Sequence, residues 1–120
     1  MFNPTIRFCP SNIAELKKAL REQYFNVSSS HADEALAASL GFRTHAAMLN
    51  ILNQIRGSTR LIVQIDPLLM LNRLEQLGYT DLNSQTLRKL MWETILPDRW
   101  QDDELQTTIR KRFIPAAANA

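Results

Sequence analysis

The residues best suited to chemistry in this sequence are one cysteine and two histidines, Cys9, His31 and His45. A cysteine thiolate beside an imidazole would be a nucleophile. The local sequence does not join the three, because Cys9 precedes a proline at the end of a predicted strand and each histidine stands at the start of a predicted helix. Together they are too few to fill a structural zinc site. We therefore predict a structural role for the cysteine, and surface or capping contacts for the histidines.

Two further patterns fall short of an enzyme site. The acidic run at 102–104 would hold a cation only if its side chains converged, and three consecutive residues of a helix spread over about 200°. The three glycines, Gly41, Gly57 and Gly78, lie too far apart for a phosphate-binding loop. We expect no catalytic residue, no metal and no cofactor, and we expect that the protein is not an enzyme.

Length and composition predict one domain over residues 1–120. The chain is 45% apolar and 22% charged, which is typical of globular proteins. No apolar stretch approaches the roughly 20 residues that span a bilayer, and the start does not resemble a secretory signal. The single cysteine excludes an internal disulfide. These features predict a cytoplasmic protein with no membrane contact and a frayed tail at 115–120.

The charge balance is slightly basic. Fourteen basic residues, ten of them arginines, stand against twelve acidic ones, and the isoelectric point is about 9.0. The densest basic run, at 110–112, follows the acidic run at 102–104. This order complements the dipole of one helix, which carries partial positive charge at its start and partial negative charge at its end. The alternative is that the basic run binds the phosphates of a nucleic acid. The helix dipole is the favoured explanation.

The hydropathy pattern predicts a mainly α-helical bundle with two short strands. β-branched and aromatic residues predict strands near 5–9 and 60–65. The second strand is apolar enough to suggest burial on both faces over part of its length. The two strands pair either with each other or across a dimer, because an unpaired strand leaves its backbone groups without partners.

About six helices are expected where apolar residues recur at helical spacing behind capping residues. Asn12 and Glu15 form a candidate capping box for the first helix. In the second, Ala32, Leu36 and Leu40 form a narrow apolar stripe. The expected helices begin at or near Asn12, Ser30, Thr44, Pro67, Ser84 and Gln101. Three of them end at a glycine, which tolerates the left-handed backbone of a helix stop. The fifth is expected to reach 96, with Ile95 turned inward.

The segment 30–56 is predicted to be a helical hairpin, and it carries the most distinctive pattern in the chain. Its first half reads Glu-x-x-Ala and then Leu-Gly-Phe, with the matching residues Glu34, Ala37, Leu40, Gly41 and Phe42. The pattern resembles a small helical module found in bacterial proteins assigned to the glyoxalase superfamily. The resemblance covers less than a third of the chain and implies a helical recognition-type module. It implies no glyoxalase chemistry, because the metal ligands of that fold lie on βαβββ units that are not predicted here.

The same segment also resembles a bacterial helix-turn-helix, with Ala37 and Gly41 at the spacing that brings two helices together. The second helix would then be the recognition helix. The candidate DNA contacts come from this helix and from basic residues next to it in the sequence. They are Arg43, Thr44, His45, Asn50, Arg56 and Arg60. Apolar residues such as Met48 and Leu49 favour a packing hairpin over a DNA reader, because base edges are read by polar side chains.

A second candidate site surrounds two tryptophans, Trp92 and Trp100. They bracket Pro97, Asp98 and Arg99. Exposed tryptophan and arginine side chains are typical interface anchors. Tryptophan side chains also cover the cores of small domains, which is the alternative role. The candidate partner-binding residues are Trp92, Arg99, Trp100, Arg110 and Arg112. We predict a non-enzymatic module that binds a protein partner, such as a small bacterial or phage-type regulator or inhibitor. Homodimer formation stays open, and a DNA-binding regulator is the alternative.

Overall fold

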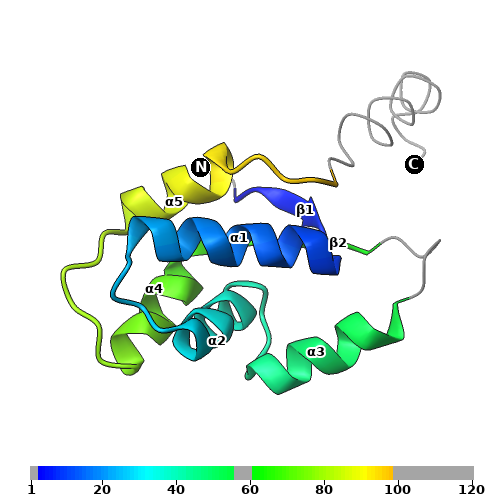
Figure 1. Cartoon of the computed structure of the whole chain (residues 1–120), viewed down its shortest axis with the longest axis horizontal. Coiled ribbons are helices and arrows are strands. Elements are labelled where there is room, and N and C mark those ends of the chain that lie inside the picture. Colours follow the sequence, from blue (N-terminus) through cyan, green and yellow to red (C-terminus); the bar gives the residue numbers. More distant parts are fainter. Residues whose placement is uncertain (1–2, 56–60, 99–120) are drawn as a thin grey trace.

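The computed structural model describes residues 3–55 and 61–98, and these confirm a mainly helical fold with a two-stranded antiparallel sheet (Figure 1). The elements in chain order are β1 (Thr5–Arg7), α1 (Pro10–Gln23), α2 (Ser29–Ser39), α3 (His45–Gln54), β2 (Ile62–Gln64), α4 (Pro67–Gln76) and α5 (Ser84–Glu93). The helix expected near 101–113 and the tail at 115–120 lie outside the described residues. In the described part of the chain, no helix is long and apolar enough to cross a bilayer.

The two strands pair with each other rather than across a dimer. Ile6 lies opposite Val63 in an antiparallel register. The ladder continues beyond the strands, because the Phe8 N–H donates to the Leu61 carbonyl over 2.7 Å. The prediction that the second strand is buried on both faces over part of its length was wrong, because no residue of β2 is fully buried. Val63 is only partly buried, since a sheet of two strands is too narrow to be enclosed.

Helix α2 lies at the centre of the helical part and packs against α1, α3 and α4. Its buried side is much wider than the predicted stripe. The buried residues are Ala32, Ala35, Leu36, Ala37, Ala38 and Ser39. Because most of these side chains are small, helices on several sides can approach the α2 backbone closely.

Several predicted helix starts are confirmed. The Thr44 hydroxyl accepts a hydrogen bond from the Ala47 N–H over 3.0 Å and caps α3. Asp66 caps α4 in the same way and accepts from the Leu68 N–H over 2.9 Å. The cap of α2 is Ser28 rather than Ser30. Side-chain oxygens at these positions satisfy backbone donors that have no partner within the helix.

The predicted capping box at Asn12 was wrong. Helix α1 begins earlier, at Pro10, and its cap position, Cys9, makes no side-chain capping bond. Proline suits the first helical turn, because its missing N–H would lack a helical partner anyway. Asn12 therefore lies inside α1, where it is fully buried.

Helices α2 and α4 end in the same kind of turn. Gly41 and Gly78 follow them with φ angles of 92° and 100°. After α2, the Phe42 N–H donates to the Ala37 carbonyl, and after α4 the Tyr79 N–H makes the equivalent bond. This is the Schellman arrangement, in which a left-handed residue lets the chain reverse and satisfy the last carbonyls. The predicted glycine stops at these two positions are confirmed.

Substituting Gly41 with alanine is expected to lower the free energy of unfolding by about 1–2 kcal/mol, because a Cβ disfavours the left-handed backbone. A Cβ at this position would meet no atom within 4 Å, so the cost comes from the backbone alone. Gly41→Asn is the matched control and should lose less, since asparagine tolerates this conformation. Urea unfolding measures both. Equal losses for the two variants would contradict the backbone explanation.

Candidate partner-binding surface

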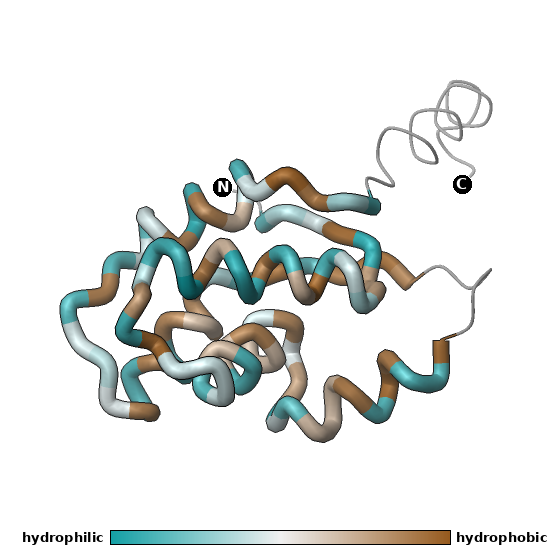
Figure 2. The backbone as a smooth tube through the Cα atoms, viewed as in Figure 1, coloured by the Kyte–Doolittle hydropathy of each residue, from teal (hydrophilic) through white to brown (hydrophobic). Residues whose placement is uncertain are grey.

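The C-terminal end of α5 exposes two large apolar side chains. Trp92 is 53% exposed and Ile95 is 76% exposed. The inward orientation predicted for Ile95 was wrong, because α5 ends at Glu93 and the chain leaves the helix before position 95. Thr94 is the C-cap residue, and its hydroxyl donates to the Leu90 carbonyl over 2.6 Å. Figure 2 shows the apolar stretch that follows α5 as a brown segment of extended chain.

Two hollows flank these side chains. One, of about 320 Å³, lies between the start of β1 and the end of α5, and both Trp92 and Ile95 line it. The other, of about 680 Å³, lies between α1 and α5, and Ile95 lines it as well. We call the second hollow the α1–α5 groove, and we call Trp92, Ile95 and the first hollow the Trp92–Ile95 surface. An exposed apolar anchor beside concave surface is typical of protein interfaces.

The α1–α5 groove carries acidic side chains around apolar ones. Glu15, Glu22 and Glu93 line it, against the single cation Lys89. Within residues 3–55 and 61–98, none of these three carboxylates forms an ion pair. The apolar part of its lining is Ala19, Leu90 and Ile95. The groove therefore suits a ligand that is basic and partly apolar.

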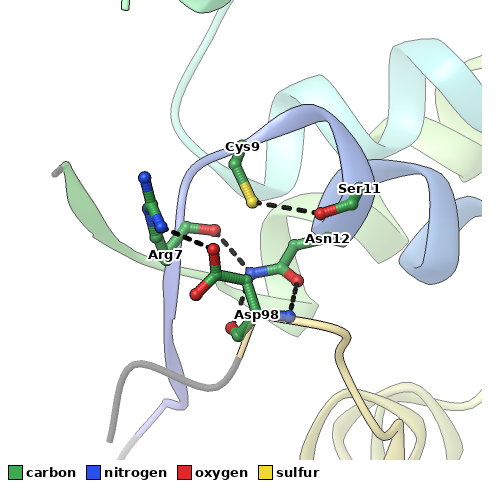
Figure 3. Close-up of polar contacts among 5 residues, drawn as sticks. All are labelled: Arg7, Cys9, Ser11, Asn12 and Asp98. Atoms are coloured by element: carbon green, nitrogen blue, oxygen red, sulfur yellow. Dashed lines mark hydrogen bonds and ion pairs between the residues drawn. The ribbon is translucent and has the colours of Figure 1, made fainter. Parts of the chain in front are cut away.

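A partly buried polar cluster holds the segment after α5 against β1 and the start of α1 (Figure 3). The Asn12 amide donates to the Arg7 carbonyl over 2.9 Å and to the Asp98 carbonyl over 3.0 Å. Its oxygen accepts from the Asp98 N–H over 3.0 Å. The Arg7 guanidinium also pairs with the Asp98 carboxylate. We call these three residues the Arg7–Asn12–Asp98 clasp, and it determines where the chain leaves the described fold.

The cysteine and the histidines each contact different neighbours. The Cys9 sulfur lies 3.5 Å from the Ser11 hydroxyl (Figure 3). His31 Nδ1 lies 2.7 Å from the Tyr79 hydroxyl, and this contact ties the start of α2 to the turn after α4. In the described part of the chain, no group of three or more His, Cys, Asp or Glu residues is arranged to hold a metal ion.

The DNA-contact candidates gather in part at the start of α3. Arg43 is exposed in the turn, Thr44 caps the helix, and His45 is its half-buried first residue. Asn50 lies further along α3, is exposed, and accepts a 3.5 Å hydrogen bond from Gln54. Arg56 and Arg60 lie outside the described residues. The residues on the exposed side of α3 are uncharged: Ala46, Ala47, Leu49, Asn50, Asn53 and Gln54.

Glu34, the acidic residue of the Glu-x-x-Ala pattern, has a structural role in this turn. Its carboxylate accepts a 3.0 Å hydrogen bond from the His45 N–H at the start of α3. The guanidinium of Arg73 on α4 lies 3.7 Å from the same oxygen and also donates to the Arg43 carbonyl over 3.1 Å. A carboxylate at a helix N-terminus is favoured by both hydrogen bonding and the helix dipole. Glu34 therefore links α2, α3 and α4.

We expect Glu34→Ala to lower the free energy of unfolding by about 1–2 kcal/mol, because it removes a capping acceptor and an ion-pair partner. The loss should be greatest in α3, which hydrogen exchange resolves residue by residue. Glu75→Ala on the exposed side of α4 is the control and should cost little. If the α3 amides keep the same protection from exchange in Glu34→Ala as in Glu75→Ala, the capping role is contradicted.

Sequence reasoning found part of the candidate surface. Of the predicted partner-binding residues, Trp92 lies within the described part of the chain, where it is exposed. The others lie outside the described residues: Arg99, Trp100, Arg110 and Arg112. Sequence reasoning missed the exposure of Ile95, the α1–α5 groove and the hydrogen bonds by which Asn12 joins Arg7 to Asp98. Pro10 and Pro97 were the available signals, since proline favours a helix start at the first and an extended residue before the second.

The chain was compared with protein-family models, with curated proteins and with solved structures, and none of them matches it. The resemblances of segment 30–56 to the glyoxalase-superfamily module and to a helix-turn-helix therefore stay predictions. The candidate function rests on the geometry of the described residues.

Proposed function

We propose that this chain is a non-enzymatic interaction module, of the regulator or inhibitor type, that binds a protein partner through the Trp92–Ile95 surface. The observation that carries the proposal is the exposure of Trp92 and Ile95 next to a hollow of about 320 Å³. Large aromatic side chains beside concave, partly apolar surface supply most of the binding energy in many interfaces. Part of that hollow is lined by Pro4, Thr5 and Ile6, so a partner would contact both ends of the described chain.

The test is affinity isolation from native lysate with the wild-type chain, with Trp92→Ala and with Ile95→Ala, all after nuclease treatment. A protein partner should survive nuclease and be retained at least roughly tenfold less by each variant, as expected for an interface anchor. Leu68→Ala is the matched control, because Leu68 is 56% exposed on α4, outside the proposed surface. Equal recovery of the partner by all four chains would refute this surface as its binding site.

A DNA-binding regulator is the second candidate and has less support. Arg43 is the one exposed cation among the described DNA-contact candidates, and the exposed side of α3 is uncharged. Phosphate contacts from lysine and arginine supply much of the affinity for DNA. A DNA titration of the full chain at low and moderate salt measures this function. Affinity that falls steeply with salt would support it, and no binding at low salt would remove it.

A further inference from the structure

A hollow of about 210 Å³ lies between the turn after α2 and one side of α4, and the proposed function does not use it. It shares no lining residue with the Trp92–Ile95 surface or with the α1–α5 groove. Its polar lining consists of two arginines and two side-chain amides, and no carboxylate lines it in the described part of the chain. These residues are Arg43, Asn72, Arg73 and Gln76. The hollow therefore presents positive charge and hydrogen-bond donors.

The rest of the lining is apolar and is fixed by the core. Phe42 stacks on the fully buried Phe8, with ring centroids 5.6 Å apart, and Ala38 is only 9% exposed. Leu69 supplies an exposed apolar side chain from α4. Gly41 also lines the hollow, and a Cβ there would meet no atom within 4 Å, so the turn leaves this space open. A matching ligand therefore has an apolar part as well as negative charge.

The two arginines differ in how far they are engaged. Arg73 donates to the Arg43 carbonyl over 3.1 Å and lies 3.7 Å from the Glu34 carboxylate, which offsets part of its charge. Arg43 is exposed, and within residues 3–55 and 61–98 its guanidinium has neither an ion pair nor a hydrogen bond. Arg73 thus fixes the turn that carries Arg43, and Arg43 keeps its donors for a ligand.

The end of α2 does not cancel this positive charge. The C-terminus of a helix carries partial negative charge, because its last carbonyls lack helical partners. In this turn, the Ala38 carbonyl accepts from the Gly41 N–H over 3.0 Å, and the Ser39 carbonyl accepts from the Asp66 N–H over 2.8 Å. These carbonyls are already hydrogen-bonded, so the arginines determine the charge that a ligand meets.

We propose that this hollow binds a carboxylate carried on a short apolar chain, a chemistry shared by free aliphatic acids and by the carboxyl-terminal residue of a peptide. The carboxylate would lie between Arg43 and Arg73, because a planar guanidinium matches its two oxygens. The chain would lie on Phe42 and Leu69. Inorganic phosphate could pair with the arginines, but it would leave the apolar lining uncovered. The volume, equal to that of about seven water molecules, suits an acid of the size of isocaproate.

The test is an NMR titration of the full chain with isocaproate and with its neutral counterpart, isocaproamide. Ionic strength is held constant, because added salt screens exposed charges. The acid should shift the backbone amide signals of Arg43, Leu69 and Asn72 in a saturable way, and the amide should not. Arg43→Gln should weaken isocaproate binding at least roughly tenfold, since it removes a charge-assisted hydrogen bond. Leu69→Ala should weaken binding of isocaproate but not of acetate, which has too short a chain to reach Leu69.

Two matched variants serve as controls. Leu68→Ala removes the neighbouring exposed leucine of α4, and Lys89→Gln removes an exposed cation of α5; neither residue lines the hollow. Both variants should bind isocaproate as the wild-type chain does. The unshifted amide signals of α1 and α5 report that each variant remains folded. A titration with N-acetyl-leucine distinguishes the two sources, because tighter binding than isocaproate indicates a peptide terminus and weaker binding indicates a free acid.

Four results would overturn the proposal. They are the absence of saturable shifts with either acid, equal binding of isocaproamide, phosphate binding as tight as that of isocaproate, and unchanged affinity in Arg43→Gln. None of these results affects the Trp92–Ile95 surface, whose own test requires a protein partner.

Discussion

Asn12→Ala is expected to lower the free energy of unfolding by about 2–4 kcal/mol. The asparagine is fully buried and makes three hydrogen bonds, two to Asp98 and one to Arg7. Alanine removes all three and leaves two carbonyls and one N–H without their partners. Each such group costs about 1–3 kcal/mol when water cannot reach it.

The measurement is urea unfolding followed by circular dichroism, with hydrogen exchange at residues 94–98. The segment should lose protection in Asn12→Ala, because Asn12 is its main backbone anchor. Asn12→Asp is the informative second variant, since it keeps the acceptor for the Asp98 N–H but loses both donors, so it should also be destabilised. Ser11→Ala, at the exposed neighbouring position, should cost under about 0.5 kcal/mol. A loss under about 1 kcal/mol for Asn12→Ala would show that the clasp does not hold the fold.

Phe8→Ala is expected to cost about 3–5 kcal/mol, because it removes a large side chain that is fully buried. The Phe8 ring stacks on Phe42, with centroids 5.6 Å apart and an interplanar angle of 25°. Phe42 directly follows Gly41 in the turn after α2, so the contact joins the sheet to that turn. The cavity left by alanine would therefore loosen two parts of the fold at once.

Thermal or urea unfolding measures this loss, and the chain supplies its own control. Phe25→Ala removes the same side chain at a position that is 87% exposed and should cost under about 0.5 kcal/mol. Phe8→Leu keeps most of the apolar volume and should cost roughly 1–2 kcal/mol. Similar losses for Phe8→Ala and Phe25→Ala would contradict the assignment of Phe8 to the core.

The features that could be predicted from the sequence are those determined by neighbours along the chain. Thr44 and Asp66 cap helices because their side chains reach a backbone N–H two or three residues on. Gly41 and Gly78 end helices because the turn itself requires a left-handed residue. Local rules describe such contacts fully, so the fold class and these helix ends followed from them.

The features that were missed depend on residues far apart in the chain. The local sequence around Asn12 is typical of a helix cap. Its actual hydrogen-bond partner, Asp98, is far away in the sequence and lies beside it only in the folded chain. The α1–α5 groove exists because two helices separated by α2, α3 and α4 lie side by side. Ile95 follows the helical spacing of α5, yet the helix stops at Glu93 and leaves it exposed. Trp92 stays within the helix and is exposed, and its role as a partner anchor stays a prediction.

The clasp also sets the order in which a newly made chain can complete its structure. Its two hydrogen bonds between Asn12 and Asp98 join residues 86 positions apart, so β1 and the start of α1 are synthesised well before Asp98. Ribosomes add roughly 5–20 residues per second, which leaves this interval at several seconds. Throughout it, the Asn12 side chain lacks both of its Asp98 partners, so the clasp forms late relative to the elements around it. The clasp therefore closes only once Asp98 is clear of the ribosome, after β1, α1 and the helices that follow α1 have been made.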